Sequence, residues 1–125
     1  MKTAEELLTD ARSRIERLTP AQALEATKEG AIIVDVRCQE DRRAEGTVPG
    51  SIHIPRMVLE WRADPSGDHR DERIADFAAH VIIMCNDGYS SSLAAATLKT
   101  MGFISVADMI SGYRGWVEAG CPIEL

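Results

Sequence analysis

The sequence has few cysteines, little positive charge and no long apolar run, and each shortage excludes a class of protein. Its three cysteines, Cys38, Cys85 and Cys121, form no C-x-x-C motif and no Cys/His ligand spacing, so neither a disulfide framework nor a zinc site is indicated. The net charge of −6 argues against nucleic acid as a partner. No apolar run approaches a membrane-spanning length, and the N-terminus lacks the apolar core of a signal peptide, so we expect a cytoplasmic protein with no membrane partner.

The length and composition are those of one ordinary globular domain. A chain of 125 residues is long enough to bury a core, and 45% hydrophobic with 27% charged residues is typical of a folded protein. No repeat or low-complexity segment interrupts it. Composition therefore indicates no particular function, and only individual motifs can do so.

The most informative stretch surrounds Cys85. Residues 81–85 are an unbroken apolar run, Val-Ile-Ile-Met-Cys, which is typical of a strand buried on both faces. A polar turn over residues 86–88 follows, in which Gly88 tolerates a positive φ. Residues 90–92 are serines that offer an N-cap for a helix over residues 93–101. A single thiol is thus predicted between the end of a strand and the start of a helix.

This position favours a reactive thiolate. The first N–H groups of a helix have no partner within it, and the helix dipole adds partial positive charge. Backbone N–H groups of a tight loop around the sulfur lower a thiol pKa further. Cys85 is therefore a candidate nucleophile. The simpler interpretation is that it is a small hydrophobic residue with no chemical role, like most cysteines of cytosolic proteins.

The order of the other elements predicts an α/β fold. Strands are expected near residues 15–18, 31–36, 51–54, 81–85 and 104–109, and helices near 3–17, 20–28, 71–79, 93–101 and 112–119. Strands that alternate with helices imply a mainly parallel five-stranded sheet with helices on both faces. We assign residues 1–14 to an N-terminal amphipathic helical extension and residues 15–125 to the domain. Ligands of such folds bind beyond the carboxyl ends of the strands, where Cys85 is predicted to lie.

The whole chain resembles a single rhodanese-like domain of the sulfurtransferase family. The resemblance rests on I-V-D-V-R at 33–37, G-T-V-P-G-S-I-H-I-P at 46–55, the Cys85 loop, and a closing segment with Gly102-Phe103, Ser111-Gly112, Trp116 and Gly120-Cys121-Pro122. It implies that Cys85 takes a sulfane sulfur from a donor as a persulfide and passes it to a thiophilic acceptor. It also implies that the backbone N–H groups of Asn86, Asp87, Gly88, Tyr89, Ser90 and Ser91 bind the terminal sulfur, without a metal or an organic cofactor.

The loop departs from the family pattern C-R-x-G-x-R. The chain has Cys85-Asn86-Asp87-Gly88-Tyr89-Ser90, with a neutral residue at both arginine positions and one added acid. Serine replaces a permanent charge with one hydroxyl, so we expect weak use of thiosulfate. A protein-borne or low-molecular-weight persulfide is the more plausible donor. Tyr89 is expected to form a wall of the pocket mouth.

Arg37 and Cys38 follow the strand over residues 31–36 and are the possible accessory residues. We expect Arg37 to form a salt bridge, with substrate binding as the alternative, and Asp35 to be a buried acceptor. Cys38 could resolve a sulfur adduct on Cys85 as a disulfide, although a bystander thiol is the simpler interpretation.

Two other functions stay open at this point. One is a rhodanese-like binding or regulatory module with weak or no catalysis. The other is a cysteine phosphatase or arsenate reductase of related fold, against which the short loop without arginine argues. The expected partners are a small sulfur-containing anion or persulfide donor and a protein sulfur donor or acceptor, and the sequence leaves both a monomer and a homodimer open.

Overall fold

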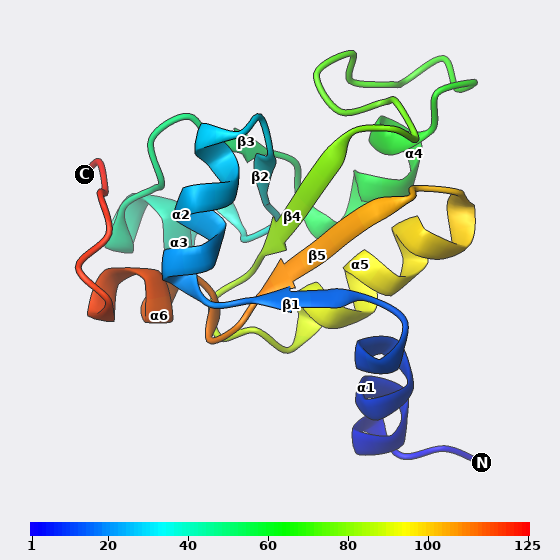
Figure 1. Cartoon of the computed structure of the whole chain (residues 1–125), viewed down its shortest axis with the longest axis horizontal. Helices are drawn as coiled ribbons and strands as arrows, with labels where there is room; N and C mark the ends of the chain where they lie inside the picture. The colour runs from blue at the N-terminus through cyan, green and yellow to red at the C-terminus, as the bar shows by residue number, and fades with distance from the viewer.

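The computed structural model of the protein describes all 125 residues and contains a five-stranded parallel sheet flanked by helices (Figure 1). The strands are β1 (Glu16–Leu18), β2 (Ile32–Asp35), β3 (Ile52–His53), β4 (His80–Met84) and β5 (Ser105–Met109). They lie in the order β1-β5-β4-β2-β3, and every neighbouring pair is parallel. The helices are α1 (Ala4–Ser13), α2 (Pro20–Lys28), α3 (Gln39–Glu45), α4 (Leu59–Ala63), α5 (Ser90–Met101) and α6 (Gly112–Glu118), with a 3₁₀ turn η1 (Arg56–Val58). The predicted fold class is confirmed.

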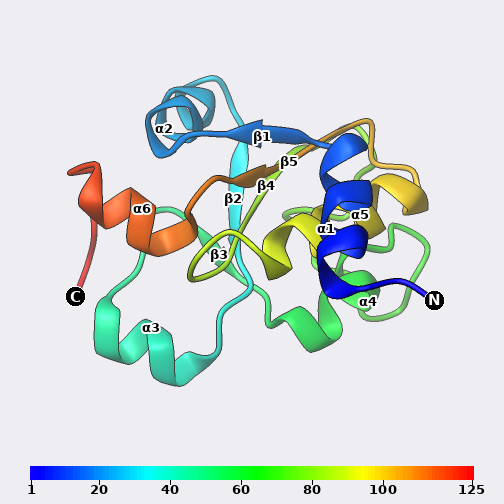
Figure 2. The ribbon, with the colours of Figure 1, turned by 90° about the horizontal axis from the view of Figure 1, so that it is seen from below.

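The central strand β4 divides its side chains between two cores because neighbouring residues of a strand point to opposite faces. Val81 and Ile83 pack on the face covered by α4 and α5, and Cys85, just beyond the strand, belongs to the same cluster. Ile82 and Met84 pack on the face covered by α2 and α6. Figures 1 and 2 show these two pairs of helices on opposite sides of the sheet. The unbroken apolar run of β4 follows from burial on both faces.

The first helix, α1, packs on the outside of α5 and extends beyond the sheet (Figure 1). Its apolar residues Leu8 and Ala11 are buried, while most of its other side chains are exposed. Even the longest helix, α5 with 12 residues, is too short to cross a bilayer, and no helix of the protein could do so.

Local sequence signals explain where α1 and α2 begin. Thr3 and Glu6 form the predicted capping box of α1, and Thr19 and Gln22 form that of α2, with Pro20 in the first turn. Each threonine hydroxyl accepts a backbone N–H that the helix leaves without a partner.

One predicted helix is absent, and two predicted helix boundaries were wrong. The helix expected over residues 71–79 is a series of turns, because Asp71 accepts the backbone N–H of Arg73 and Asp76 accepts that of Ala78. The helix expected from residue 93 begins at Ser90, and the first helix ends at Ser13. Two helices were not predicted from the sequence: α3, which has no buried residue, and α4, which is only five residues long. Both lack the apolar periodicity on which a prediction depends.

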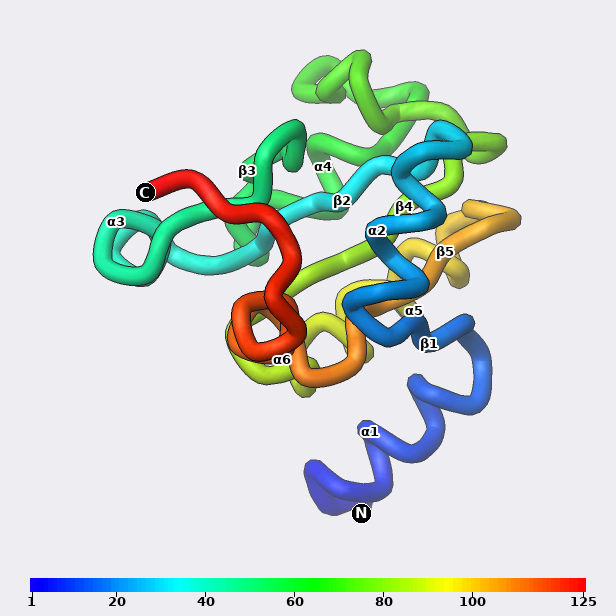
Figure 3. The backbone as a smooth tube through the Cα atoms, turned by 60° about the vertical axis from the view of Figure 1, so that its left-hand side comes forward, coloured from blue at the N-terminus to red at the C-terminus, as the bar shows by residue number.

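The C-terminal tail fastens the turn after α3. Thr47 and Glu124 exchange two backbone hydrogen bonds of 2.8 Å, and Figure 3 shows the tail leaving α6 and running toward α3. Gly46 allows this approach, since a Cβ atom there would lie 2.7 Å from the Glu124 carbonyl oxygen.

Candidate active site

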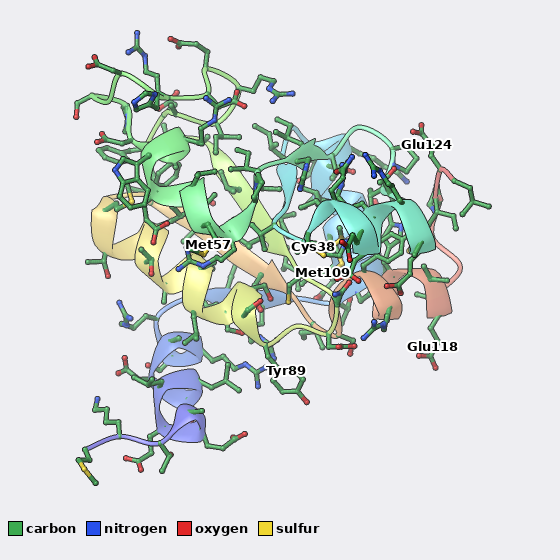
Figure 4. All side chains as sticks on the ribbon, turned by 180° about the vertical axis from the view of Figure 1, so that it is seen from behind. Cys38, Met57, Tyr89, Met109, Glu118 and Glu124 are labelled. Carbon is green, nitrogen blue, oxygen red and sulfur yellow. The ribbon has the colours of Figure 1, made fainter.

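The predicted site residues meet at the carboxyl ends of β2 and β4. Cys85 follows β4 directly, and Arg37 and Cys38 follow β2. A cavity of about 320 Å³ opens there, lined by Val36, Arg37, Cys38, Asp41, Cys85, Asn86, Asp87, Tyr89 and Ser90. Figure 4 labels two of these residues, Cys38 after β2 and Tyr89 at the start of α5. Gly88 and Ser91 do not line the cavity, but both contact the Cys85 sulfur.

Cys85 is 6% exposed, and its thiol sulfur accepts two backbone N–H groups. Gly88 N lies 3.2 Å and Ser91 N 3.4 Å from Sγ. Burial raises the pKa of this thiol, but hydrogen bonds from Ser91, Ser90 and Gly88 outweigh burial, so the pKa is lowered. Because the Ser91 hydroxyl donates its one proton to Asp108 at 2.8 Å, the hydrogen bond from Ser91 to the sulfur comes from its backbone N–H.

Further amides of the loop have no partner in the protein. The N–H groups of Asn86, Asp87, Tyr89 and Ser90 donate to no acceptor, and no side chain caps the N-terminus of α5. Unpaired N–H groups at a helix start, with the helix dipole, favour an anion. Chemically, the arrangement can hold a thiolate or a negatively charged group attached to the sulfur.

The start of α6 supports the loop from behind. Tyr113 N donates to the Cys85 carbonyl at 2.8 Å and Arg114 N to that of Asn86 at 3.1 Å. A Cβ atom on Gly112 would lie 2.4 Å from the Cys85 carbonyl oxygen, and one on Gly88, where φ is 87°, would lie 2.7 Å from Ser111 N. Both positions therefore require glycine.

Arg37 is a buried structural residue, as expected. Its Nη2 lies 2.9 Å from the Asp35 carboxylate, and both side chains are fully buried. It also donates to the Gly46 carbonyl and stacks over the Tyr113 ring, with Cζ 3.9 Å from the ring centre. The buried acceptor role of Asp35 is confirmed, and a part for Arg37 in substrate binding stays a prediction.

The cavity mouth carries two carboxylates. Asp41, which the sequence analysis did not single out, accepts Asn86 Nδ2 at 2.8 Å and the Cys38 thiol at 3.2 Å. These hydrogen bonds, that from Asn86 being the larger effect, hold the pKa of Asp41 below its usual value. Asp87 pairs with Arg114 at 2.7 Å. The Cys38 thiol is exposed, and whether it reacts stays a prediction.

A second missed residue, Asp108 of β5, lies fully buried behind the loop. Its carboxylate accepts the hydroxyls of Ser91 and Ser92 at 2.8 Å each and Arg17 Nε at 2.8 Å. A lone acid inside an apolar strand was the available signal, because such a group needs hydrogen-bond partners.

No group of three or more His, Cys, Asp or Glu residues is placed to hold a metal ion.

Comparison with known proteins identifies the family. The family model of the rhodanese-like domain matches residues 19–119. The thiosulfate sulfurtransferase GlpE of Haemophilus influenzae is 34% identical over 108 residues, which is 86% of this chain and 92% of that protein.

Two solved structures have a similar fold. A protein of unknown function and possible tyrosine phosphatase from Rhodopseudomonas palustris is 33% identical with a TM-score of 0.91, over 99% of this chain and 96% of that one. The polysulfide-sulfur transferase homodimer of Wolinella succinogenes is 25% identical with a TM-score of 0.76, over 94% and 83% of the two chains. With its parallel sheet and the loop that follows Cys85, this chain belongs to the rhodanese-like domain family.

Proposed function

We propose that the protein is a sulfurtransferase that carries sulfane sulfur as a persulfide on Cys85. The observation that carries the proposal is the Cys85 sulfur, which accepts backbone N–H groups from Gly88 and Ser91 at one end of an open cavity. GlpE and the Wolinella protein, both named as sulfur transferases, support this reaction class. The lowered pKa of the Cys85 thiol and its contacts with backbone amides, which are both features of an activated thiol, support the same role.

The reaction has two displacement steps. The Cys85 thiolate attacks the sulfane sulfur of the donor, a new S–S bond forms, and the donor leaves with the electron pair, as sulfite from thiosulfate or as a thiolate from a persulfide. A nucleophilic acceptor then attacks the outer sulfur of the Cys85 persulfide, and Cys85 leaves as a thiolate. Backbone N–H groups over residues 86–91 stabilise the anionic terminal sulfur, and Ser90 occupies the position of the usual arginine. No metal or organic cofactor takes part.

The charges at the mouth favour a donor with little negative charge. Asp41 is half-buried at the cavity and ionised at neutral pH, and Asp87 is half exposed and paired with Arg114. No arginine of the loop is available to offset them for the thiosulfate dianion. A persulfide of a small thiol or of a protein is therefore the preferred donor in this proposal.

Mass spectrometry of the intact protein tests the proposal. The reduced protein is exposed to thiosulfate and, separately, to a persulfide donor, and one added sulfur is located by peptide mapping. We expect a reducible adduct on Cys85, formed faster from the persulfide. Cys85→Ser should lose it, while Cys121→Ser, which removes a thiol away from the cavity, should keep it. Equal loading of Cys85→Ser contradicts the assignment.

The same experiment separates the other candidates. A protein whose Cys85 alkylates normally but takes sulfur from neither donor is better explained as a binding module. Hydrolysis of an aryl phosphate would favour the phosphatase suggested for the Rhodopseudomonas relative. We expect none, because the loop has no arginine to bind the phosphoryl group.

A further inference from the structure

Two arginines contact the loop after Cys85 without lining the cavity. Arg12 Nη2 lies 2.8 Å and Arg17 Nη2 3.0 Å from the Gly88 carbonyl oxygen. Arg12 also donates to the Ser92 hydroxyl at 3.1 Å, and its Cζ lies 5.6 Å from the centre of the Tyr89 ring. The loop is thus held from outside by side chains more than 70 residues away in the sequence.

Both arginines precede the part of the chain that the family model matches, which begins at residue 19. Arg17 is in β1, while Arg12 is in α1, the helix that packs on the outside of α5. The helix therefore reaches the candidate active site through a single half-buried side chain.

The peptide between Gly88 and Tyr89 links these arginines to the sulfur site. Gly88 donates its N–H to Cys85 Sγ and turns its carbonyl toward the two guanidinium groups. A trans peptide is planar, so the Tyr89 N–H points opposite to the Gly88 carbonyl, away from the arginines. That N–H has no acceptor in the protein, while the Tyr89 side chain lines the cavity. The arginine contacts thus fix the orientation of the Gly88–Tyr89 peptide and with it the direction of the Tyr89 N–H.

The two arginines differ in whether a carboxylate neutralises their positive charge. Arg17 is neutralised by Asp108, 2.8 Å from its Nε. Arg12 forms no salt bridge, so its charge acts on the loop without a carboxylate to cancel it. On the cavity side, Arg37 is paired with Asp35. The other charged groups of the cavity are the carboxylates Asp41 and Asp87, of which Asp87 is paired with Arg114.

We propose that Arg12 is a positioning residue of the candidate active site. From α1 it fixes the Gly88 carbonyl, and with it the Gly88–Tyr89 peptide of the loop, and it brings a positive charge to a loop that has no arginine of its own. The inference builds on the proposed sulfur chemistry of Cys85, but its consequence is a property of the thiol itself. Loss of Arg12 should leave the thiolate less stabilised.

The test measures the alkylation rate of Cys85 by iodoacetamide against pH in the full-length protein. Arg12→Gln keeps a long polar side chain but removes the charge. We expect its rate near pH 7 to fall about threefold to tenfold, with the midpoint of the profile moved to higher pH and equal rates at high pH. Arg12→Lys, which keeps the charge but not the fork of donors, should show a smaller shift in the same direction.

Arg14→Gln is the matched control. Arg14 ends the same helix and also contacts α5, but it does so at Thr100, far along the helix from the loop. Its alkylation profile should match that of the natural protein. An unchanged profile for Arg12→Gln, or an equal shift for Arg14→Gln, would overturn the proposal, since the second result means that general docking of α1 is what matters. Should Arg12→Gln fail to fold, an unchanged profile for Arg12→Lys overturns it.

The readout also separates this inference from the proposed function. Alkylation reports only the thiol, so a shifted profile in Arg12→Gln supports the positioning role even in a protein that takes no sulfur from any donor. Sulfur loading that depends on Cys85, together with an unaltered alkylation profile in Arg12→Gln, would support the proposed function and reject the positioning role.

Discussion

The two sides of the Cys85 loop are built in different ways. Behind the loop lies a buried network, in which Asp108 accepts from Arg17, Ser91 and Ser92. At the cavity mouth, Asp41 is paired with the half-buried Asn86, and Asp87, whose side chain is 50% exposed, is paired with Arg114. The buried side determines the shape of the loop, because unpaired polar groups there are costly. The more exposed side can vary its charge at little cost, and under the proposed function this charge would determine which donor approaches.

The first prediction concerns a substitution that disrupts the buried network around Asp108. Asp108→Asn removes the charge that pairs with Arg17. The hydroxyls of Ser91 and Ser92 then compete for a single amide oxygen. Breaking a buried pair is strongly destabilising, so we expect a loss of about 3 kcal/mol in the free energy of unfolding. Urea denaturation measures it. Asp68→Asn, at an exposed position, is the control and should change stability by less than about 0.5 kcal/mol.

The second prediction changes the charge at the mouth. Ser90→Arg puts a cation at the position where the family has arginine, on an exposed residue that lines the cavity. We expect about a tenfold higher kcat/KM with thiosulfate, corresponding to about 1.4 kcal/mol of charge-assisted hydrogen bonding, and a smaller change with a persulfide. Ser90→Gln supplies length without charge and should not give this gain. An unchanged apparent thiosulfate affinity in Ser90→Arg would show that the missing charge is not limiting.

The third prediction removes one negative charge from the mouth. Asp41→Asn should raise kcat/KM for thiosulfate by about twofold to fivefold, because solvent screens the charge of this partly exposed side chain. Glu40→Gln makes the same change in net charge on the neighbouring exposed residue of α3. A gain as large for Glu40→Gln would show that overall charge, and not the contact with Asn86, limits thiosulfate use.

The smallest expected effect concerns stability against pH. Folding lowers the pKa of the Cys85 thiol, so the folded state loses its proton at a lower pH than the unfolded state. The stability gained from the thiolate is therefore fully present above the unfolded pKa of about 8.5 and is lost as pH falls through the folded pKa. The unfolding free energy of the natural protein relative to Cys85→Ser should rise across that window. A difference that does not vary with pH would contradict the lowered pKa.

Much of the fold could be predicted because its signals are local. The apolar run before Cys85, the capping boxes of α1 and α2 and the positive φ of Gly88 each depend on a few neighbouring residues. The elements that were missed or misplaced carry weak or competing local signals. Asp71, for example, binds backbone N–H groups of a turn and prevents the helix that its sequence neighbours favour. The division at residues 14 and 15 into an extension and a domain stays a prediction.

The sequence by itself determined the strand that presents Cys85, the turn that follows it and the family, because these depend on residues close together in the chain. Only the tertiary structure decided what surrounds the thiol. Arg12 and Arg17 are far in the sequence from Asp108 and from the Cys85 loop. They reach these groups only when α1 and β1 pack beside α5 and β5. Such contacts depend on strand order and helix packing, and no local pattern of residues specifies them.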